Sequence, residues 1–163
     1  MRITTLLAFI AALAFSGAAA AHGDSPRKSA PKKPVSTEEK PFGREGDPSN
    51  ATRTIKVDMT DKMRFSPGEL RIKAGQTIRF EVKNSGKTKH EMVLGTMQEL
   101  KDHAELMRKH PGMEHDEPYM GHVAPGKTER IVWHFTKPGE FYYGCLIPGH
   151  FEAGMVGKIV VAR

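Results

Sequence analysis

From about residue 51 to the carboxyl terminus, apolar and polar residues alternate in short runs separated by glycine and proline. In residues 54–59 and 76–83, every second side chain is apolar, which is typical of strands with one buried face. Further extended segments are expected at residues 63–73, with an interruption at 66–68, and at residues 90–94, 127–135, 139–144 and 155–161. The pattern therefore predicts a chain built mainly of short strands.

The turns between these segments indicate how the strands connect. Residues 84–86 read Asn-Ser-Gly, and residues 125–126 and 138–139 both read Pro-Gly, all common turn sequences. Short strands at this spacing favour an antiparallel β-sandwich with Greek-key connections. The fold class is therefore expected to be all-β, with one domain over residues 51–163, a length typical of a single small domain.

One segment departs from the strand pattern. Residues 98–110 have high helical propensity and are followed by Pro111 and Gly112, which would end a helix. We expect them to form a short helix within an insertion at about residues 95–121. The insertion is expected to lie across one end or side of the sandwich.

The amino-terminal residues show the three regions of a secretory signal peptide. Arg2 precedes an uncharged run over residues 3–15, which is followed by small residues up to residue 21. The apolar run is too short to span a bilayer, although a membrane anchor is the alternative reading. Residues 1–21 are therefore predicted to be a cleaved signal peptide, and the mature protein is expected in the periplasm with no membrane insertion.

Residues 22–50 are rich in Pro, Lys, Ser and Glu and contain almost no large apolar side chains. Such a segment buries too little apolar surface to offset its ordering entropy, so we expect a flexible leader. The formal net charge of the chain is +6, which favours solubility. Because no cluster of Lys or Arg is interleaved with aromatic residues, no nucleic-acid binding is expected.

The chain has one cysteine, Cys145, although exported proteins usually form disulfides. His150 and Met155 follow it at intervals of five residues, and Pro148 and Gly149 bend the chain between Cys145 and His150. The three side chains can therefore converge from one loop onto one ion. Two histidines and one cysteine in a trigonal arrangement, with a weak axial methionine, form the ligand set of a blue-copper centre.

His90 is the candidate for the second histidine, since it follows the turn at residues 84–86 and begins a predicted strand. With it, the chain resembles the cupredoxin family, in which one His comes from an early strand and the Cys, His and Met come from the loop before the last strand. The resemblance runs in order from about Ile55 to Val161. Asn84 before the first histidine and the aromatic residues 141–143 before the cysteine also match the family pattern.

The resemblance implies a cupredoxin-like Greek-key β-sandwich with one mononuclear type 1 copper. In it, His90, Cys145 and His150 would be the strong ligands and Met155 the axial one. The spacing of the loop resembles the rusticyanin type. A dinuclear copper centre is not expected, because the paired-cysteine loop of such centres is absent. Family membership also implies that electrons enter through the ring of His150.

Other readings of these residues stay open. Cysteine and methionine are commonly buried in cores, so Cys145 and Met155 could be packing residues, and a histidine beside Pro-Gly could simply be exposed. The same residues could hold zinc in vitro, although thioether ligation favours Cu(I) over zinc. We expect copper, as Cu(I) and Cu(II), to be the cofactor.

A second group of histidines and methionines lies in and near the insertion. Thioethers with imidazoles suit Cu(I), and imidazoles with carboxylates suit Cu(II), so we expect an accessory copper cluster. Its candidates are Met92, Met97, His103, Met107, His110, Met113, His115, Met120 and His122. On a helix, His103, Met107 and His110 would share one face. Leu100, Ala104 and Met107 would also form an apolar stripe, so packing is the alternative for Met107.

Together, the two groups resemble the periplasmic copper-tolerance cupredoxins of the green-copper type. That resemblance implies a protein of copper tolerance and homeostasis, which binds copper and oxidises Cu(I) to Cu(II) with help from the accessory cluster. The alternative is a soluble electron carrier between respiratory partners, and a third reading is a metal-free structural module. The expected partners are copper ions and a redox partner protein, and we expect a monomer.

Overall fold

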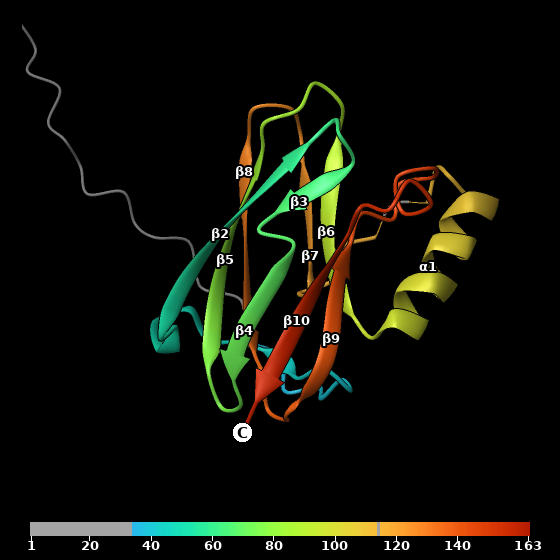
Figure 1. Cartoon of the computed structure of the whole chain (residues 1–163). Helices are drawn as coiled ribbons and strands as arrows, with labels where there is room; N and C mark the ends of the chain where they lie inside the picture. Colours follow the sequence, from blue (N-terminus) through green and yellow to red (C-terminus); the bar gives the residue numbers. More distant parts are fainter. Residues whose placement is uncertain (1–33, 114) are drawn as a thin grey trace, which may run out of the picture. The chain divides into compact units, whose positions relative to one another are not determined.

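The computed structural model of the chain describes residues 34–113 and 115–163. The predicted signal peptide and the first part of the predicted leader, up to residue 33, lie outside the described residues. Within the described part, the chain forms short strands in two sheets and one α-helix (Figure 1). This arrangement confirms the predicted all-β sandwich with a short helix.

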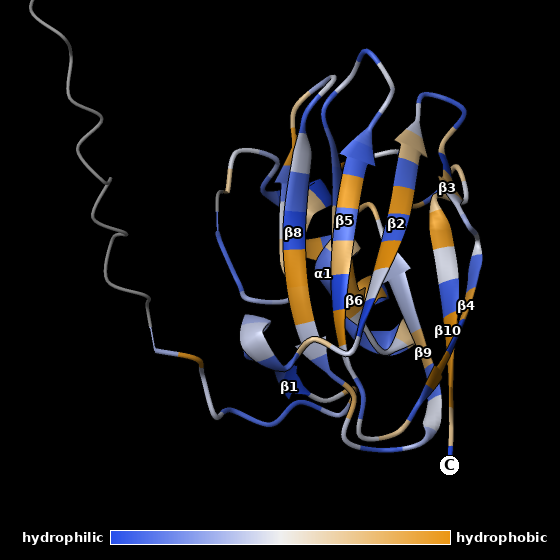
Figure 2. Cartoon of the chain, turned by 90° about the vertical axis from the view of Figure 1, so that its left-hand side faces the viewer, coloured by the Kyte–Doolittle hydropathy of each residue, from blue (hydrophilic) through white to orange (hydrophobic). Residues whose placement is uncertain are grey.

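The first sheet has five strands, which lie in the order β1, β8, β5, β2, β3. Their bounds are Arg44–Glu45 for β1, Thr128–His134 for β8, Thr77–Asn84 for β5, Arg53–Thr60 for β2 and Arg64–Ser66 for β3. Apolar and polar residues alternate along β2, β5 and β8 (Figure 2), because one face of this sheet is buried and the other is open to solvent.

The second sheet also has five strands, in the order β4, β10, β9, β6, β7. Their bounds are Glu69–Lys73 for β4, Val156–Ala162 for β10, Gly139–Gly144 for β9, His90–Gly95 for β6 and Met120–Val123 for β7. Strand β7 falls at the end of the predicted insertion and was not expected from the sequence.

Each sheet contains one parallel pair, and its other neighbouring strands pair antiparallel, as the sequence predicted. Strand β2 pairs in parallel with β5, and β4 pairs in parallel with β10. The chain crosses to the second sheet at β4 before it returns to the first sheet at β5, so β5 runs in the same direction as β2. Such crossings between sheets are characteristic of Greek-key connections.

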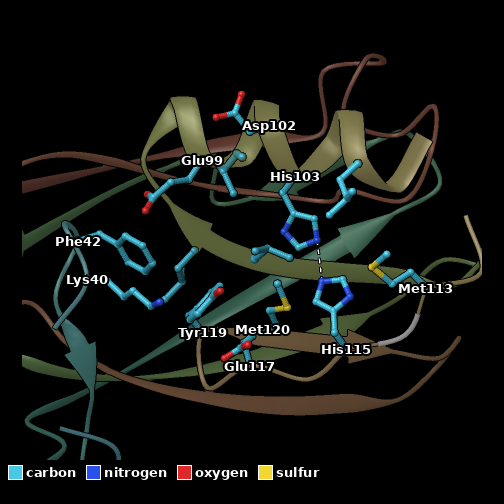
Figure 3. Close-up of a pocket in the computed structure, with 14 residues that line it drawn as sticks. Lys40, Phe42, Glu99, Asp102, His103, Met113, His115, Glu117, Tyr119 and Met120 are labelled. Atoms are coloured by element: carbon cyan, nitrogen blue, oxygen red, sulfur yellow. Dashed lines mark hydrogen bonds between the residues drawn. The ribbon is translucent and has the colours of Figure 1, made fainter. Parts of the chain in front are cut away.

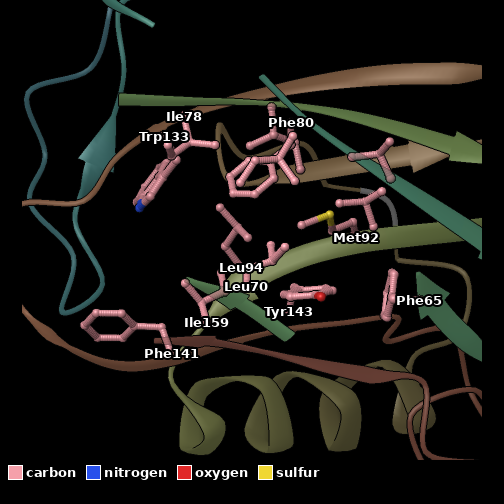
Figure 4. Packing of buried hydrophobic residues seen from close by; sticks show 14 of the residues in the cluster. Phe65, Leu70, Ile78, Phe80, Met92, Leu94, Trp133, Phe141, Tyr143 and Ile159 are labelled. Carbon is pink, nitrogen blue, oxygen red and sulfur yellow. The ribbon is translucent and has the colours of Figure 1, made fainter. Parts of the chain in front are cut away.

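The main core fills the space between the two sheets (Figure 4). The largest fully buried side chains include Trp133, Tyr143, Phe80 and Phe135. The inward-facing residues of β6, namely Met92 and Leu94, belong to the same cluster. Every residue of β6 is nonetheless buried, because the outer face of this strand is covered as well.

The outer face of β6 is covered by the predicted helix, α1, which spans Met97–Lys109. Thr96 caps its first turn, and the side chain of Glu99 bonds back to the backbone of Thr96, so the first N–H groups are satisfied. The buried stripe of α1 consists of Leu100, Ala104 and Met107. The helix packs against β6 and β9 and forms a second apolar cluster with residues of the second sheet.

Residues 34–50 differ from the flexible leader expected from the sequence. Strand β1 pairs with β8, and Phe42 is only 3% exposed. The ring of Phe42 stacks on Trp133 with 5.1 Å between the ring centroids, and the indole N–H of Trp133 donates to the carbonyl of Phe42 over 2.9 Å. One large apolar residue in a polar segment therefore fixes that segment against the first sheet.

We predict that Phe42→Ala lowers the free energy of unfolding by about 3 to 5 kcal/mol, because it empties a buried aromatic site against Trp133. Urea unfolding of the metal-free protein measures the change. The control is Leu106→Ala, which removes a side chain that is 41% exposed on α1 and should cost less than about 1 kcal/mol. Equal effects of the two substitutions would show that residues 34–50 add nothing to the fold.

Candidate metal centre

The loop between β9 and β10 brings three of the predicted ligand residues together. Cys145 comes directly after β9, and Met155 directly before β10. The backbone N–H of Cys145 donates to the carbonyl of Met155 over 3.1 Å, and the N–H of Met155 donates to the carbonyl of His150 over 3.0 Å. These bonds close the loop on itself, so its side chains are held near one another. Gly149, in the left-handed region with φ of 87°, makes the bend before His150.

His90 completes the group from the start of β6. The ligand atoms of His90, Cys145 and His150 all lie within 4.8 Å of one another. The thiol Sγ is 3.2 Å from Nδ1 of His150 and 4.0 Å from Nδ1 of His90. With metal–sulfur and metal–nitrogen bonds of about 2.3 and 2.0 Å, as in zinc sites, ligands at trigonal angles lie about 3.7 Å apart. The observed separations fall on either side of that value, so the three side chains fit one small ion.

Burial differs sharply among the four residues. His90, Cys145 and Met155 are 0% exposed, whereas His150 is partly exposed. Pro148 and Gly149 beside it are exposed. The ring of His150 is therefore the part of this group that lies nearest the solvent.

Asp61 orients the ring of His90. Its Oδ1 lies 3.1 Å from Nε2 of His90, on the side of the ring opposite to the Nδ1 that faces Cys145. The same carboxylate accepts hydrogen bonds from the backbone N–H of Lys87 and from both the N–H and the hydroxyl of Thr88. These bonds, with that from Lys87 the strongest cause, hold the pKa of Asp61 well below its usual range. A charged acceptor at Nε2 favours the tautomer in which Nδ1 is free to bind a metal.

Asn84 holds the turn that leads into His90. Its side chain is fully buried, donates to the carbonyls of Thr88 and Val123, and accepts from the N–H of Gly86. A Cβ atom at Gly86 would lie 2.3 Å from Oδ1 of Asp61, so a side chain there would displace the carboxylate that contacts His90. The Asn-Ser-Gly turn thus positions both a ligand candidate and its carboxylate partner.

Burial raises the pKa of the Cys145 thiol from 9.0 to about 12. Burial and the neighbouring His90 lower the pKa of His150. At neutral pH the metal-free group therefore holds a neutral thiol beside the neutral imidazole of His150. A thiolate forms there only when a cation is bound, and binding releases the thiol proton.

The donor set agrees with copper better than with a hard cation. Two imidazoles and a thiol are ligands of soft or borderline metals, and the nearby thioether of Met155 is a soft donor. The fold and this group of residues define a copper-binding β-sandwich.

The comparisons with known proteins agree. The model of the family described as "Copper binding proteins, plastocyanin/azurin family" matches residues 51–162, and the chain belongs to this family. A copper-resistant cuproprotein, CopI, of Rubrivivax gelatinosus is 53% identical over 121 residues, which cover 74% of this chain and 73% of that protein. A protein of the same name from Pseudomonas aeruginosa is 35% identical over 149 residues, with 74% and 82% covered. The chain is thus a cupredoxin related to copper-resistance proteins, and copper is its cofactor.

Solved structures support the fold. The reduced auracyanin of Roseiflexus castenholzii superposes with a TM-score of 0.60 at 22% identity, covering 69% of this chain and 99% of that one. In the part of the chain that the structure describes, none of the helices is long and apolar enough to cross a membrane.

The predicted accessory residues do not all meet. Met92 is fully buried in the core between the sheets. Met107 lies on the buried side of α1, and Met120 belongs to the apolar cluster beneath the helix, so both make packing contacts, as the alternative reading proposed for Met107. Met97 lies in the first turn of α1, and His110 is exposed at its carboxyl end.

The other accessory candidates line two neighbouring grooves beside α1. His103, Met113 and His115 line a groove of about 430 Å³, together with Met120 (Figure 3). Met113, His115 and His122 line a second groove of about 750 Å³. Met107 and His150 also line the second groove, which therefore extends from the accessory residues to the edge of the metal centre.

Two residues with direct contacts to these groups were not identified as site residues from the sequence. Asp61 is 29 residues away from His90, and nothing in the local pattern marks it. Glu91 could have been found, since a carboxylate inside an otherwise apolar strand signals a buried partner. It is 5% exposed, and its Oε1 accepts from the N–H of Leu146, next to Cys145.

The stability of the metal-free protein should fall as the pH rises above 9. The thiol of Cys145 ionises near pH 9 when unfolded but near pH 12 when folded, so between these values the unfolded chain loses a proton that the folded chain keeps. Urea unfolding at pH 8 and pH 10.5 should show a loss about 2 kcal/mol larger in the wild type than in Cys145→Ser. If the free energy of unfolding fell by the same amount in both proteins, the thiol would not be buried.

Proposed function

We propose that the chain holds one type 1 copper through His90, Cys145 and His150, with Met155 as the axial ligand, and that it acts in periplasmic copper tolerance. The observation that carries the proposal is the buried thiol with two imidazole nitrogens 3.2 and 4.0 Å away. The burial of Met155 beside the closed loop supports its axial role. The CopI relatives are named as copper-resistant cuproproteins, which supports copper tolerance, and the predicted signal peptide supports the location.

The protein residues would do three things for a bound copper. Asp61 orients His90, the backbone bonds of the loop hold Cys145 and Met155 in place, and burial excludes water from the thiolate. A bound copper supplies one-electron chemistry at this position. Because the candidate ligands are held by a closed loop and a strand, they would rearrange little between oxidation states of a bound copper, which would favour rapid electron exchange.

Copper tolerance would also include oxidation of Cu(I), the more toxic form. Cu(I) in the groove beside α1 would be the substrate and would become Cu(II) by giving one electron to the copper that His90, Cys145 and His150 would hold. The partly exposed ring of His150 would pass that electron to a one-electron acceptor protein. The groove of about 750 Å³ supports this scheme, because His150 and the thioethers of Met107 and Met113 line it together.

An electron carrier between respiratory partners is the second candidate function. The partly exposed ring of His150, flanked by exposed Pro148 and Gly149, favours it, because such an edge can meet a partner protein. The two functions differ in what the cell loses without the centre. Copper tolerance requires the centre only under excess copper, whereas an electron carrier is needed for respiration at ordinary copper concentrations.

Cys145→Ser should abolish the intense visible absorption of the copper-loaded protein and leave the sandwich folded, because only the thiolate donor is lost. In a bacterial host that lacks its own copy of the gene, the wild-type chain should restore growth at high copper and Cys145→Ser should not. Absorption spectra and growth curves measure these outcomes. Full restoration of growth by a colourless Cys145→Ser protein would rule out a role of the type 1 centre in tolerance.

Met155→Leu should keep copper but raise the reduction potential, since a weak donor that stabilises Cu(II) is removed. A tenfold loss of preference for Cu(II) raises a one-electron potential by about 59 mV, and we expect a shift of that order. The matched control is Met92→Leu, another fully buried methionine that lies in the core cluster of the sandwich. Cyclic voltammetry measures both, and an unchanged potential in Met155→Leu would contradict the axial role.

A further inference from the structure

A second group of metal-binding side chains lies on the outer face of the second sheet, under and beside α1. His103 comes from α1, His115 from the loop after it, His122 from β7 and Glu91 from β6. His103 and His115 face each other in Figure 3, with ring centroids 4.6 Å apart. Four segments therefore contribute to one region.

The sheet register places Glu91 and His122 together. The two residues lie directly opposite each other on β6 and β7, so their side chains project on the same face. Oε2 of Glu91 is 3.0 Å from Nδ1 of His122. The other oxygen of Glu91 accepts from the backbone N–H of Leu146, which fixes the carboxylate. A buried carboxylate that receives Nδ1–H of a histidine leaves Nε2 as the metal-binding nitrogen, as in many metal sites.

Several acceptor atoms in this region face one another. Nε2 of His103 lies 2.7 Å from Nε2 of His115, so one proton or a cation must lie between them. Nε2 of His122 lies 3.0 Å from the carbonyl oxygen of His115 and 3.6 Å from Oδ1 of Asp116. When Nδ1–H of His122 donates to Glu91, Nε2 carries no proton. It is then an acceptor that faces two acceptor oxygens. A bound cation would satisfy these atoms together.

Two more observations bear on metal binding here. Nδ1 of His115 is buried and has no hydrogen-bond partner among the described residues. Burial, followed by the neighbouring His115, lowers the pKa of His103, which keeps its ring neutral and able to bind a metal. Because His115 lines both grooves beside α1, an ion can reach this region from solvent.

We propose that His103, His115 and His122 form a second metal site that takes Cu(II), and that Glu91 positions His122 within it. The choice of copper rests on the proposed function, whereas the site itself does not. Imidazole ligands bind Cu(II) more tightly than other divalent ions of the first transition row, Zn(II) included. The thioether of Met113 at the rim is not needed for this ion.

Binding would require a small rearrangement of the loop that carries His115. Among groups of three or more His, Cys, Asp or Glu in the described residues, His90, Cys145 and His150 are the one group whose ligand atoms all lie within 4.8 Å of one another. Two nitrogens that share a metal lie about 3 Å apart, so the 2.7 Å between His103 and His115 needs little change. The remaining change brings in His122, and it falls on a loop rather than on a helix or strand.

The test compares Cu(II) binding by the mature full-length protein and its variants in equilibrium dialysis, with Cu(II) as the only added metal. The double variant His103→Gln/His115→Gln should bind one equivalent less than the wild type and lose a type 2 signal in electron paramagnetic resonance. Glu91→Gln should weaken this equivalent by about 10- to 100-fold. His110→Gln is the control, since His110 is exposed at the end of the same helix and should bind as the wild type does.

The thiolate absorption band is recorded in every sample, so loss of the second site is distinguished from loss of the type 1 centre. A retained band with one missing equivalent supports the second site. A missing equivalent in the absence of any band would support it as well, and would contradict the proposed function instead. Unchanged stoichiometry in the double variant overturns the inference. If that variant unfolds, as thermal melting would show, His122→Gln replaces it and must also lose the equivalent.

Discussion

The centre depends on one constraint, which is the complete burial of the Cys145 thiol beside two imidazoles. A thiol in that position stays protonated at neutral pH, since its pKa is raised to about 12, and only a bound cation makes the thiolate stable there. The sandwich supplies the burial, and the loop between β9 and β10 supplies His150. Asp61 and Asn84 then place His90 beside the sulfur as well.

Much of the fold and of this centre could be predicted from local sequence. The alternation of apolar and polar residues along β2 and β5 indicates one buried face. The five-residue intervals between Cys145, His150 and Met155 indicate that their side chains converge on one point. Asp61 could not be found in this way, because its contact with His90 exists only after distant segments are brought together. Phe42 was missed for a related reason: composition averages over a segment, whereas one buried ring is enough to order it.

The accessory residues show what residue types alone cannot decide. Histidines and methionines near the insertion were grouped by chemistry, but the faces of α1, β6 and β7 separate them. Inward-facing Met92 joins the core, whereas Glu91 and His122 are paired across the outer face by the strand register. Helical periodicity gave Met107 both a metal-binding and a packing reading, and both stay open, since Met107 belongs to the buried stripe of α1 and also lines the second groove.

Two neighbouring residues of β6, His90 and Glu91, belong to two different side-chain clusters. His90 points toward Cys145, and the next residue, Glu91, points toward His122. Because strand side chains alternate between faces, a shift of pairing by one residue would exchange the two environments. We therefore expect evolution to accept point changes in the rest of this strand more readily than a single-residue insertion or deletion, which would disable both regions at once.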